Sequence, residues 1–157
     1  MRVSKAAPPT PPATPHLGPN MTQKAVPTVR IGAHALVAGG ATLVAGHSAH
    51  VFQDVAGNVI YDLGGLIDDS AVDPWLRNDL GLLFLVDLIS TGPLRLEAIP
   101  IFLDHCRTRI ARGEEAARIG RRFTEACAEM GTQVQSIGDR LVIECAPSGA
   151  LATREVP

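Results

Sequence analysis

The sequence predicts an α/β fold with a mixed sheet and a β-hairpin. Three observations lead to this prediction: a helical segment followed by Gly-Gly and a short apolar run, two long apolar segments around a Gly-Pro turn, and an amphipathic segment near the carboxyl end. Helices and strands alternate in the first half, whereas strands follow one another closely in the second. A chain of 157 residues suffices for one compact domain.

The amino-terminal segment is rich in proline, with seven of the 12 prolines in the first 27 positions. Proline donates no backbone hydrogen bond, and this segment has few apolar side chains to bury. We therefore expect a disordered tail over residues 1–15, a folded portion over residues 16–146 and a second disordered tail over residues 147–157. Deletion of residues 1–15 is expected to cost little stability.

The first predicted elements are a helix and two short buried strands. Apolar residues recur on one face of residues 28–40, and the pair Gly39-Gly40 ends this helix. Residues 41–45 (ATLVA) form a continuous apolar run that is typical of a strand covered on both faces. A turn over residues 54–58 then leads into a second apolar strand over residues 59–63.

The second half begins with two long apolar segments, residues 80–89 and 94–102. The four residues between them, Ser-Thr-Gly-Pro, have turn chemistry. The pattern predicts a β-hairpin.

An amphipathic helix is predicted next, over residues 114–130, because apolar positions alternate with arginines at helical spacing and Gly131 follows. Two short strands, residues 132–137 and 141–145, then flank a Gly138-Asp139 turn.

Composition excludes several classes of protein. Fourteen Lys and Arg against sixteen Asp and Glu give a net charge of −2, so no nucleic-acid partner is expected. The longest apolar runs fall well short of the ~20 residues that span a bilayer, and the amino terminus does not read as a secretory signal. We therefore expect no membrane span and a cytoplasmic location. Cys106, Cys127 and Cys145 lack the spacing of a disulfide framework or zinc site and are expected to be buried free thiols.

The densest group of potential ligands is the GHSAH segment at residues 46–50, directly after a predicted buried strand. The carboxyl ends of such strands are where α/β proteins usually place their sites. On a tight loop, the imidazoles of His47 and His50 can converge on one metal or one phosphate, and Gly46 permits a backbone conformation that a β-carbon would hinder. The alternative is two neighbouring surface histidines. Ser48 is expected to make a turn hydrogen bond.

Other candidate residues have simpler interpretations. His34 is expected on the helix surface or as a hydrogen-bonded core histidine, and His105 is expected in a solvated or salt-linked role. The pair Asp68-Asp69 either ligates a metal or ends a strand with solvated charge. Trp75 is expected to anchor the core or a loop.

Three segments together carry a resemblance: HLGPN at residues 16–20, HALVAGGATLVAGHSAHVFQ at residues 34–53, and VIYDLGGLIDD at residues 59–69. They resemble the carboxyl-terminal half of the CapA family, the poly-γ-glutamate capsule biosynthesis proteins. In that family an HWG motif precedes a helix, an apolar strand leads into a GHxxH motif that is usually followed by Gln, and a YxLGNF segment comes next. The resemblance extends over approximately residues 16–145.

The resemblance implies a partial metallophosphatase-like α/β/β/α sandwich, because the family is similar to calcineurin-like metallophosphoesterases with two metals between their sheets. It implies His16, His47 and His50 as ligands of Zn, Mn or Fe, with Gln53 at the position of the usual Gln. Leu17 replaces the family's Trp, and Gly65 replaces its Asn or Asp. The family's opening GD strand and NH motif have no counterpart here, so the chain is expected to be truncated and to lack half of the metal site.

Two functions follow as hypotheses. One is a metal-dependent phosphoesterase-like or capsule-polymer protein that acts on a phosphoester or an anionic polymer. The alternative is a non-catalytic remnant or protein-interaction module with vestigial histidines, which uses an exposed sheet edge or forms a homo-oligomer. By itself the chain is expected to show no appreciable phosphodiesterase activity but to bind one metal through His47 and His50.

Overall fold

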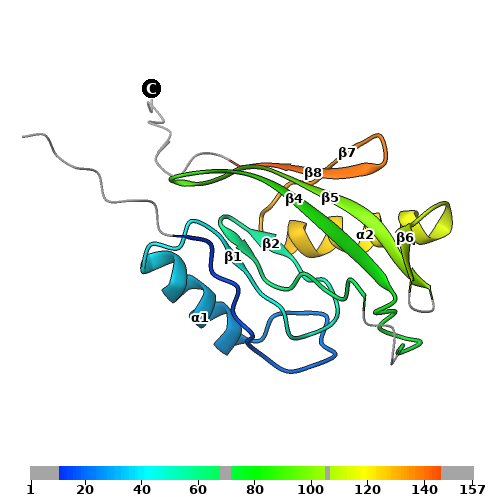
Figure 1. The fold of residues 1–157 in the computed structure, drawn as a ribbon, viewed down its shortest axis with the longest axis horizontal. Helices are drawn as coiled ribbons and strands as arrows, with labels where there is room; N and C mark the ends of the chain where they lie inside the picture. Colours follow the sequence, from blue (N-terminus) through cyan, green and yellow to red (C-terminus); the bar gives the residue numbers. More distant parts are fainter. Residues whose placement is uncertain (1–10, 68–71, 105–106, 146–157) are drawn as a thin grey trace, which may run out of the picture.

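The structure is a computed structural model that describes residues 11–67, 72–104 and 107–145. The elements lie in the order α1 (Pro27–Ala38), β1 (Val44–Ala45), β2 (Val55–Ala56), β3 (Val59–Ile60), β4 (Leu80–Ile89), β5 (Gly92–Asp104), β6 (Arg107–Ile110), α2 (Glu114–Glu129), β7 (Gln135–Ile137) and β8 (Arg140–Glu144). Figure 1 shows two layers of sheet, with α1 beside the smaller one.

The smaller sheet has the order β1-β3-β2. Its strands β1 and β3 are parallel, whereas β2 and β3 form an antiparallel hairpin around Gly57-Asn58. One face packs against α1, in a cluster that includes Val29 and Ala33 from the helix and Val44 and Val59 from the strands. This helix-on-sheet unit fixes the position of the chain that leaves β1.

The larger sheet is antiparallel, with the order β4-β5-β8-β7 and with β6 also paired to β5. The register of β4 on β5 runs from Leu80 opposite Phe102 to Ile89 opposite Gly92, with one irregularity after Asp87. Side chains alternate between the faces, so that Leu82 lies on the core side and Leu83 on the exposed side.

Helix α2 joins the two sheets into one core. Its fully buried residues Ile119, Phe123 and Cys127 pack in a cluster that contains residues of both sheets. Phe123 makes edge-to-face contacts with Phe52 and Phe84, at ring separations of 6.3 and 5.9 Å. The core therefore lies between the smaller sheet, α2 and the inner face of the larger sheet (Figure 1).

The predicted fold class is confirmed: the protein is α/β, with a three-stranded mixed sheet, a β-hairpin and two helices in its described part. The hairpin of β4 and β5 and the helix α2 lie where the sequence predicts them. The predicted strands over residues 41–45 and 59–63 are only two residues long as β1 and β3. Strands β6 and β2 are not predicted from the sequence, and β2 lies within the predicted turn over residues 54–58.

The prediction of an unstructured segment up to residue 15 is wrong at Ala13. Ala13 forms a parallel bridge with Val44, donating its N–H to Leu43 O at 2.8 Å and accepting from Ala45 N at 2.9 Å. This pairing extends the smaller sheet beyond β1. It is compatible with the proline-rich sequence because Ala13 itself supplies the N–H. Residues 1–10 and 147–157 lie outside the described residues.

Three further expectations concern Trp75, the cysteines and a membrane span. Trp75 was expected to anchor the core or a loop, but it is 85% exposed. Cys127 is a buried free thiol as expected, Cys145 is half-buried, and Cys106 lies outside the described residues. Neither described helix is long and apolar enough to cross a membrane.

Candidate functional site

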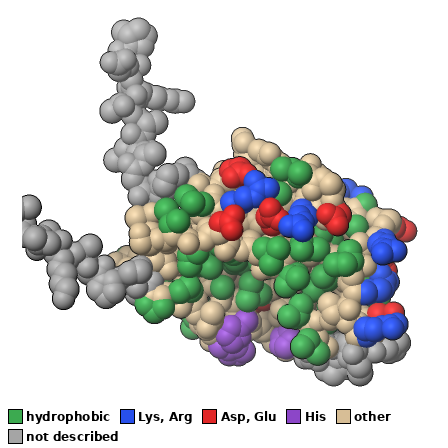
Figure 2. Space-filling model, turned by 45° about the horizontal axis from the view of Figure 1, so that its top comes forward, with side chains coloured by type: hydrophobic (Ala, Val, Ile, Leu, Met, Phe, Trp, Pro, Cys, Tyr) green, Lys and Arg blue, Asp and Glu red, His purple; other side chains and the backbone are tan. Residues whose placement is uncertain are grey.

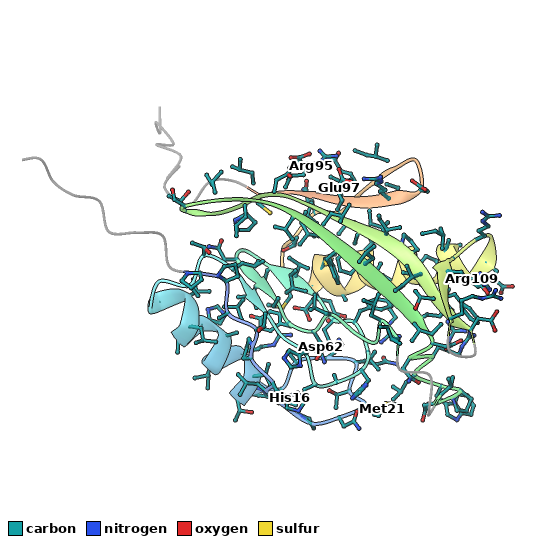
Figure 3. All side chains as sticks on the ribbon, in the orientation of Figure 1. His16, Met21, Asp62, Arg95, Glu97 and Arg109 are labelled. Atoms are coloured by element: carbon teal, nitrogen blue, oxygen red, sulfur yellow. The ribbon has the colours of Figure 1, made fainter. Side chains whose placement is uncertain are left out.

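The candidate site is the loop that leaves β1, residues 46–53, together with the segment around His16 (Figure 3). Gly46 is required at the start of this loop because a β-carbon there would lie 2.2 Å from the carbonyl oxygen of Tyr61. Glycine is therefore required at this position because the backbone of Tyr61 approaches it so closely. Gly46 N donates to Ile60 O, and Gly46 O accepts from Leu63 N, each at 2.9 Å.

His16 and His47 come together at the protein surface. Their Nδ1 atoms are 3.3 Å apart, and the ring centroids are 5.2 Å apart at an angle of 50°. Both side chains are exposed, so this pair is open to solvent and to ligands. Because 31 positions separate the two residues, only the family resemblance predicted that they belong to the same site.

The orientation of His47 follows from its second nitrogen, Nε2, which lies 3.2 Å from the carbonyl oxygen of Thr14. A carbonyl only accepts hydrogen bonds, so the neutral ring carries its proton on Nε2 and keeps a lone pair on Nδ1. That lone pair faces His16. Metal-binding histidines commonly make the same type of contact with a backbone carbonyl through the nitrogen that does not bind the metal.

Asp62, two residues after the end of β3, holds the loop that carries His47. Its Oδ2 accepts hydrogen bonds from the N–H groups of Ser48 and Ala49, and its Oδ1 accepts from Gly64 N, each at 2.8 Å. Burial raises the pKa of the Asp62 carboxyl, while these three bonds and the nearby His47 act in the opposite direction. The carboxylate therefore acts as an internal anchor for the loop.

Gln53 and Ser48 link the loop to the segment that follows His16. The Gln53 amide donates to Thr22 O at 3.0 Å, and the Ser48 hydroxyl donates to Gly18 O at 2.9 Å. The Ser48 bond crosses between two segments, so it is more than the local turn contact that the sequence suggested. Ala49 O also accepts from Met21 N at 2.9 Å.

The geometry of the histidine pair fits two ligands of one metal ion. Two nitrogens bound to a tetrahedral Zn²⁺ at 2.0–2.1 Å are about 3.3 Å apart, which matches the separation of the two Nδ1 atoms. Across residues 11–67, 72–104 and 107–145, however, no three or more His, Cys, Asp or Glu side chains are grouped to hold a metal. If a metal ion binds here, His16 and His47 would supply two ligands, and water or substrate would have to complete the coordination.

His50 has a different environment from the pair. It is half-buried and adopts a left-handed backbone conformation, with φ of 57°. The next two residues, Val51 and Phe52, are buried. Asp68 and Asp69, the other candidate ligands, lie outside the described residues.

Two groups that hold the site in place are not predicted from the sequence. Asp62 was not selected, although a single carboxylate within the apolar run VIYDLGG is a signal that could have found it. The Thr14 contact uses a backbone carbonyl, which no side-chain pattern reveals. Figure 2 shows histidine side chains on the molecular surface at the border of an apolar area.

The fold and site together define an α/β protein with a surface histidine pair at the end of a small sheet. Residues 12–70 match the family model of the bacterial capsule synthesis protein PGA_cap. This match covers the segment around His16, the GHSAH loop and β3, and over these residues the chain is similar to the bacterial capsule synthesis proteins. The comparison with curated proteins finds no matching relative. The larger sheet and α2 follow residue 70 and lie beyond the match.

Proposed function

We propose that this protein, whose residues 12–70 match the bacterial capsule synthesis model, binds one divalent transition metal through Nδ1 of His16 and Nδ1 of His47. Through that ion it binds an anionic group, either a phosphoester or a carboxylate of an anionic capsule polymer such as poly-γ-glutamate. The observation that carries the proposal is the 3.3 Å separation of the two nitrogens. The bound metal would supply positive charge for the anion.

The chain's own residues support this role in three ways. Thr14 O fixes the protonated nitrogen of His47, which leaves the other nitrogen free to bind a cation. The pair is exposed and therefore accessible to a large substrate. Imidazole ligands favour Zn, Ni or Cu over Mg, and Mn and Fe also bind to histidine sites, so Zn²⁺ is the appropriate first probe.

Binding without hydrolysis is the activity that this site supports best. Two-metal phosphoesterases hold two cations about 3.5–4 Å apart and stabilise both the attacking and the leaving oxygen. A second cation needs further ligands, and no third ligand joins His16 and His47 in the described part of the chain. The proposal is therefore metal-dependent binding of an anion, with a phosphoesterase-like site that does not turn over phosphodiesters by itself.

The test is calorimetric titration with Zn²⁺ and with Mn²⁺, combined with an assay of bis-nitrophenyl phosphate hydrolysis. The variants are His16→Ala and His47→Ala, with His34→Ala as the matched control. His34 is an exposed histidine on α1 whose Nε2 lies 3.2 Å from the Tyr61 hydroxyl.

The expected result is one Zn²⁺ per chain, lost in His16→Ala and in His47→Ala but kept in His34→Ala, with no turnover of the phosphodiester. Equal binding by all variants would contradict the metal site. Metal-dependent hydrolysis that both substitutions abolish would show that the site is catalytic and would overturn the binding-only proposal.

A second candidate function is self-association through β4. This strand lies at the end of the larger sheet, contains neither Lys nor Pro, and carries Asp87 as its one charge. Leu83 and Leu85 on its outer face are 38% and 45% exposed. Such an edge is a template for another strand, and Figure 2 shows an apolar area bordered by charged side chains.

The partner that fits the edge of β4 best is the β4 strand of a second copy of this protein. If two β4 strands pair in antiparallel orientation about Phe84, Leu83 of one copy lies opposite Leu85 of the other. The same register puts Asp87 opposite Gly81, so the two Asp87 carboxylates stay apart. This candidate corresponds to an interaction module and does not require the histidines.

A further inference from the structure

Asp62 joins three backbone groups that belong to two different parts of the chain. The N–H groups of Ser48 and Ala49 come from the loop after β1, and that of Gly64 comes from the segment after β3. All three hydrogen bonds are 2.8 Å long, and Asp62 is 2% exposed. A single buried carboxylate thus determines the position of the residue that follows His47.

A buried carboxylate is costly unless hydrogen bonds or an opposite charge compensate it. Three N–H donors provide part of that compensation. None of the ion pairs with Lys or Arg among the described residues involves Asp62. The three backbone N–H groups are therefore the contacts that hold the Asp62 side chain in place.

A second set of bonds holds the segment of His16 against the same loop. Ser48 Oγ donates to Gly18 O, Gln53 Nε2 donates to Thr22 O, and Met21 N donates to Ala49 O, at 2.9, 3.0 and 2.9 Å. Ser48 and Ala49 therefore bond to Asp62 on one side and to residues 18–21 on the other. One hydrogen-bond network therefore links the segment of His16 to the loop of His47, and the Asp62 carboxylate is part of it.

We propose that Asp62 is a positioning residue that holds His47 at ligand distance from His16. This inference rests on the proposed metal site, because it assigns the residue that organises that site. Asp62 does not need to touch the metal. It acts through the backbone of Ser48 and Ala49.

The variant that tests this role is Asp62→Asn, which keeps the shape but removes the charge and turns one acceptor into a donor. Asp54→Asn is the matched control. Asp54 is a carboxylate of similar burial, but its carboxylate is paired with the guanidinium of Arg30 at 3.5 Å. Both variants are expected to lower the melting temperature.

Zn²⁺ titration and the visible spectrum of bound Co²⁺ distinguish the two variants. We expect Asp62→Asn to bind Zn²⁺ about tenfold more weakly or worse and to change the Co²⁺ spectrum, whereas Asp54→Asn binds within about threefold of the wild type. Wild-type affinity and spectrum in a folded Asp62→Asn protein would overturn the proposal. If Asp62→Asn does not fold, Asp62→Glu takes its place: the extra methylene displaces the loop and is expected to weaken binding, and unchanged binding contradicts the positioning role.

Amide hydrogen exchange of the metal-free protein tests the positioning role of Asp62 independently of metal binding. In the wild type the amides of Ser48 and Ala49 are expected to exchange slowly, and in Asp62→Asn much faster than in Asp54→Asn. If the wild type binds no Zn²⁺, the proposed function fails, yet selective loss of protection still supports Asp62 as the anchor of the histidine pair. Equal protection in both variants would show that Asp62 does not hold the loop.

Discussion

Gly46 and Tyr61 approach each other so closely that no side chain fits between them. A β-carbon at Gly46 would lie 2.2 Å from the Tyr61 carbonyl oxygen and 3.1 Å from its carbonyl carbon. Both contacts are with backbone atoms, which cannot rotate away. The start of the histidine loop is therefore fixed against the chain that leaves β3.

The first prediction is that Gly46→Ala destabilises the protein by about 1–3 kcal/mol, the usual range for overpacking. Urea unfolding measures the change. Gly120→Ala is the control. Gly120 lies within helix α2, and a β-carbon there would lie 3.7 Å from Leu141 Cδ2, an ordinary contact distance. That substitution is expected to stabilise by about 0.5–1 kcal/mol. Equal effects of the two substitutions would contradict the close approach.

The second prediction concerns the Cys127 thiol, whose burial raises its pKa to about 11. In the unfolded chain the thiol ionises from its ordinary value of 9.0. The folded state therefore holds more protons between pH 9 and 11, and the free energy of unfolding falls as the pH rises through this window. Below pH 9 the thiol is neutral in both states and contributes no pH dependence.

The measurement is urea unfolding of the wild type and Cys127→Ala at several pH values from 7 to 10.5. The difference between their pH dependences isolates this thiol from the other groups that titrate at high pH. We expect the wild type to lose more stability above pH 9 than the variant. Parallel curves would show that the thiol is not held neutral.

The third prediction revises the sequence-based expectation for the amino terminus. A chain that begins at Pro11 keeps both hydrogen bonds of Ala13, whereas one that begins at Pro15 loses them and exposes the Ala45 N–H. Each lost backbone bond costs about 0.5–1.5 kcal/mol. We expect the shorter chain to melt about 5 °C or more below the longer one. Identical melting temperatures would mean that the Ala13 bridge contributes nothing.

The fourth prediction tests self-association through β4. Replacement of Leu83 and Leu85 by Gln is expected to convert a concentration-dependent dimer into a monomer, as measured by light scattering after gel filtration. Ile31→Gln is the control, since Ile31 is 70% exposed on α1. A wild type that stays monomeric at all concentrations, or a double variant that still dimerises, would reject this candidate.

The sequence predicts the elements whose own residues encode them. Helix α2 has a clear apolar face, and β4 is a long apolar run that ends at a turn. In contrast, β6 has the sequence RTRI, which shows no strand pattern and exists because it pairs with residues 101–104 of β5. Strand β2 likewise depends on tertiary contacts, including the bond from Val55 N to the Cys127 sulfur.

The candidate site likewise contains residues that the sequence predicts and contacts that it does not. The GHSAH segment is visible in the sequence because two histidines follow an apolar run, and His16 entered through the family resemblance. The partner of His47 on its second nitrogen is a backbone carbonyl, and the anchor Asp62 lies 15 positions further along the chain. Such contacts arise from the approach of separate segments, which local patterns do not specify.

The central claim is that Nδ1 of His16 and Nδ1 of His47 bind the same metal ion. Nitrogen NMR of the histidine rings during titration with Zn²⁺ tests it most directly. The account predicts that the Nδ1 resonances of both residues shift together and saturate at one Zn²⁺ per chain, while Nε2 of His47 stays protonated against Thr14 O. Binding through Nε2, or a shift of either residue without the other, would contradict it.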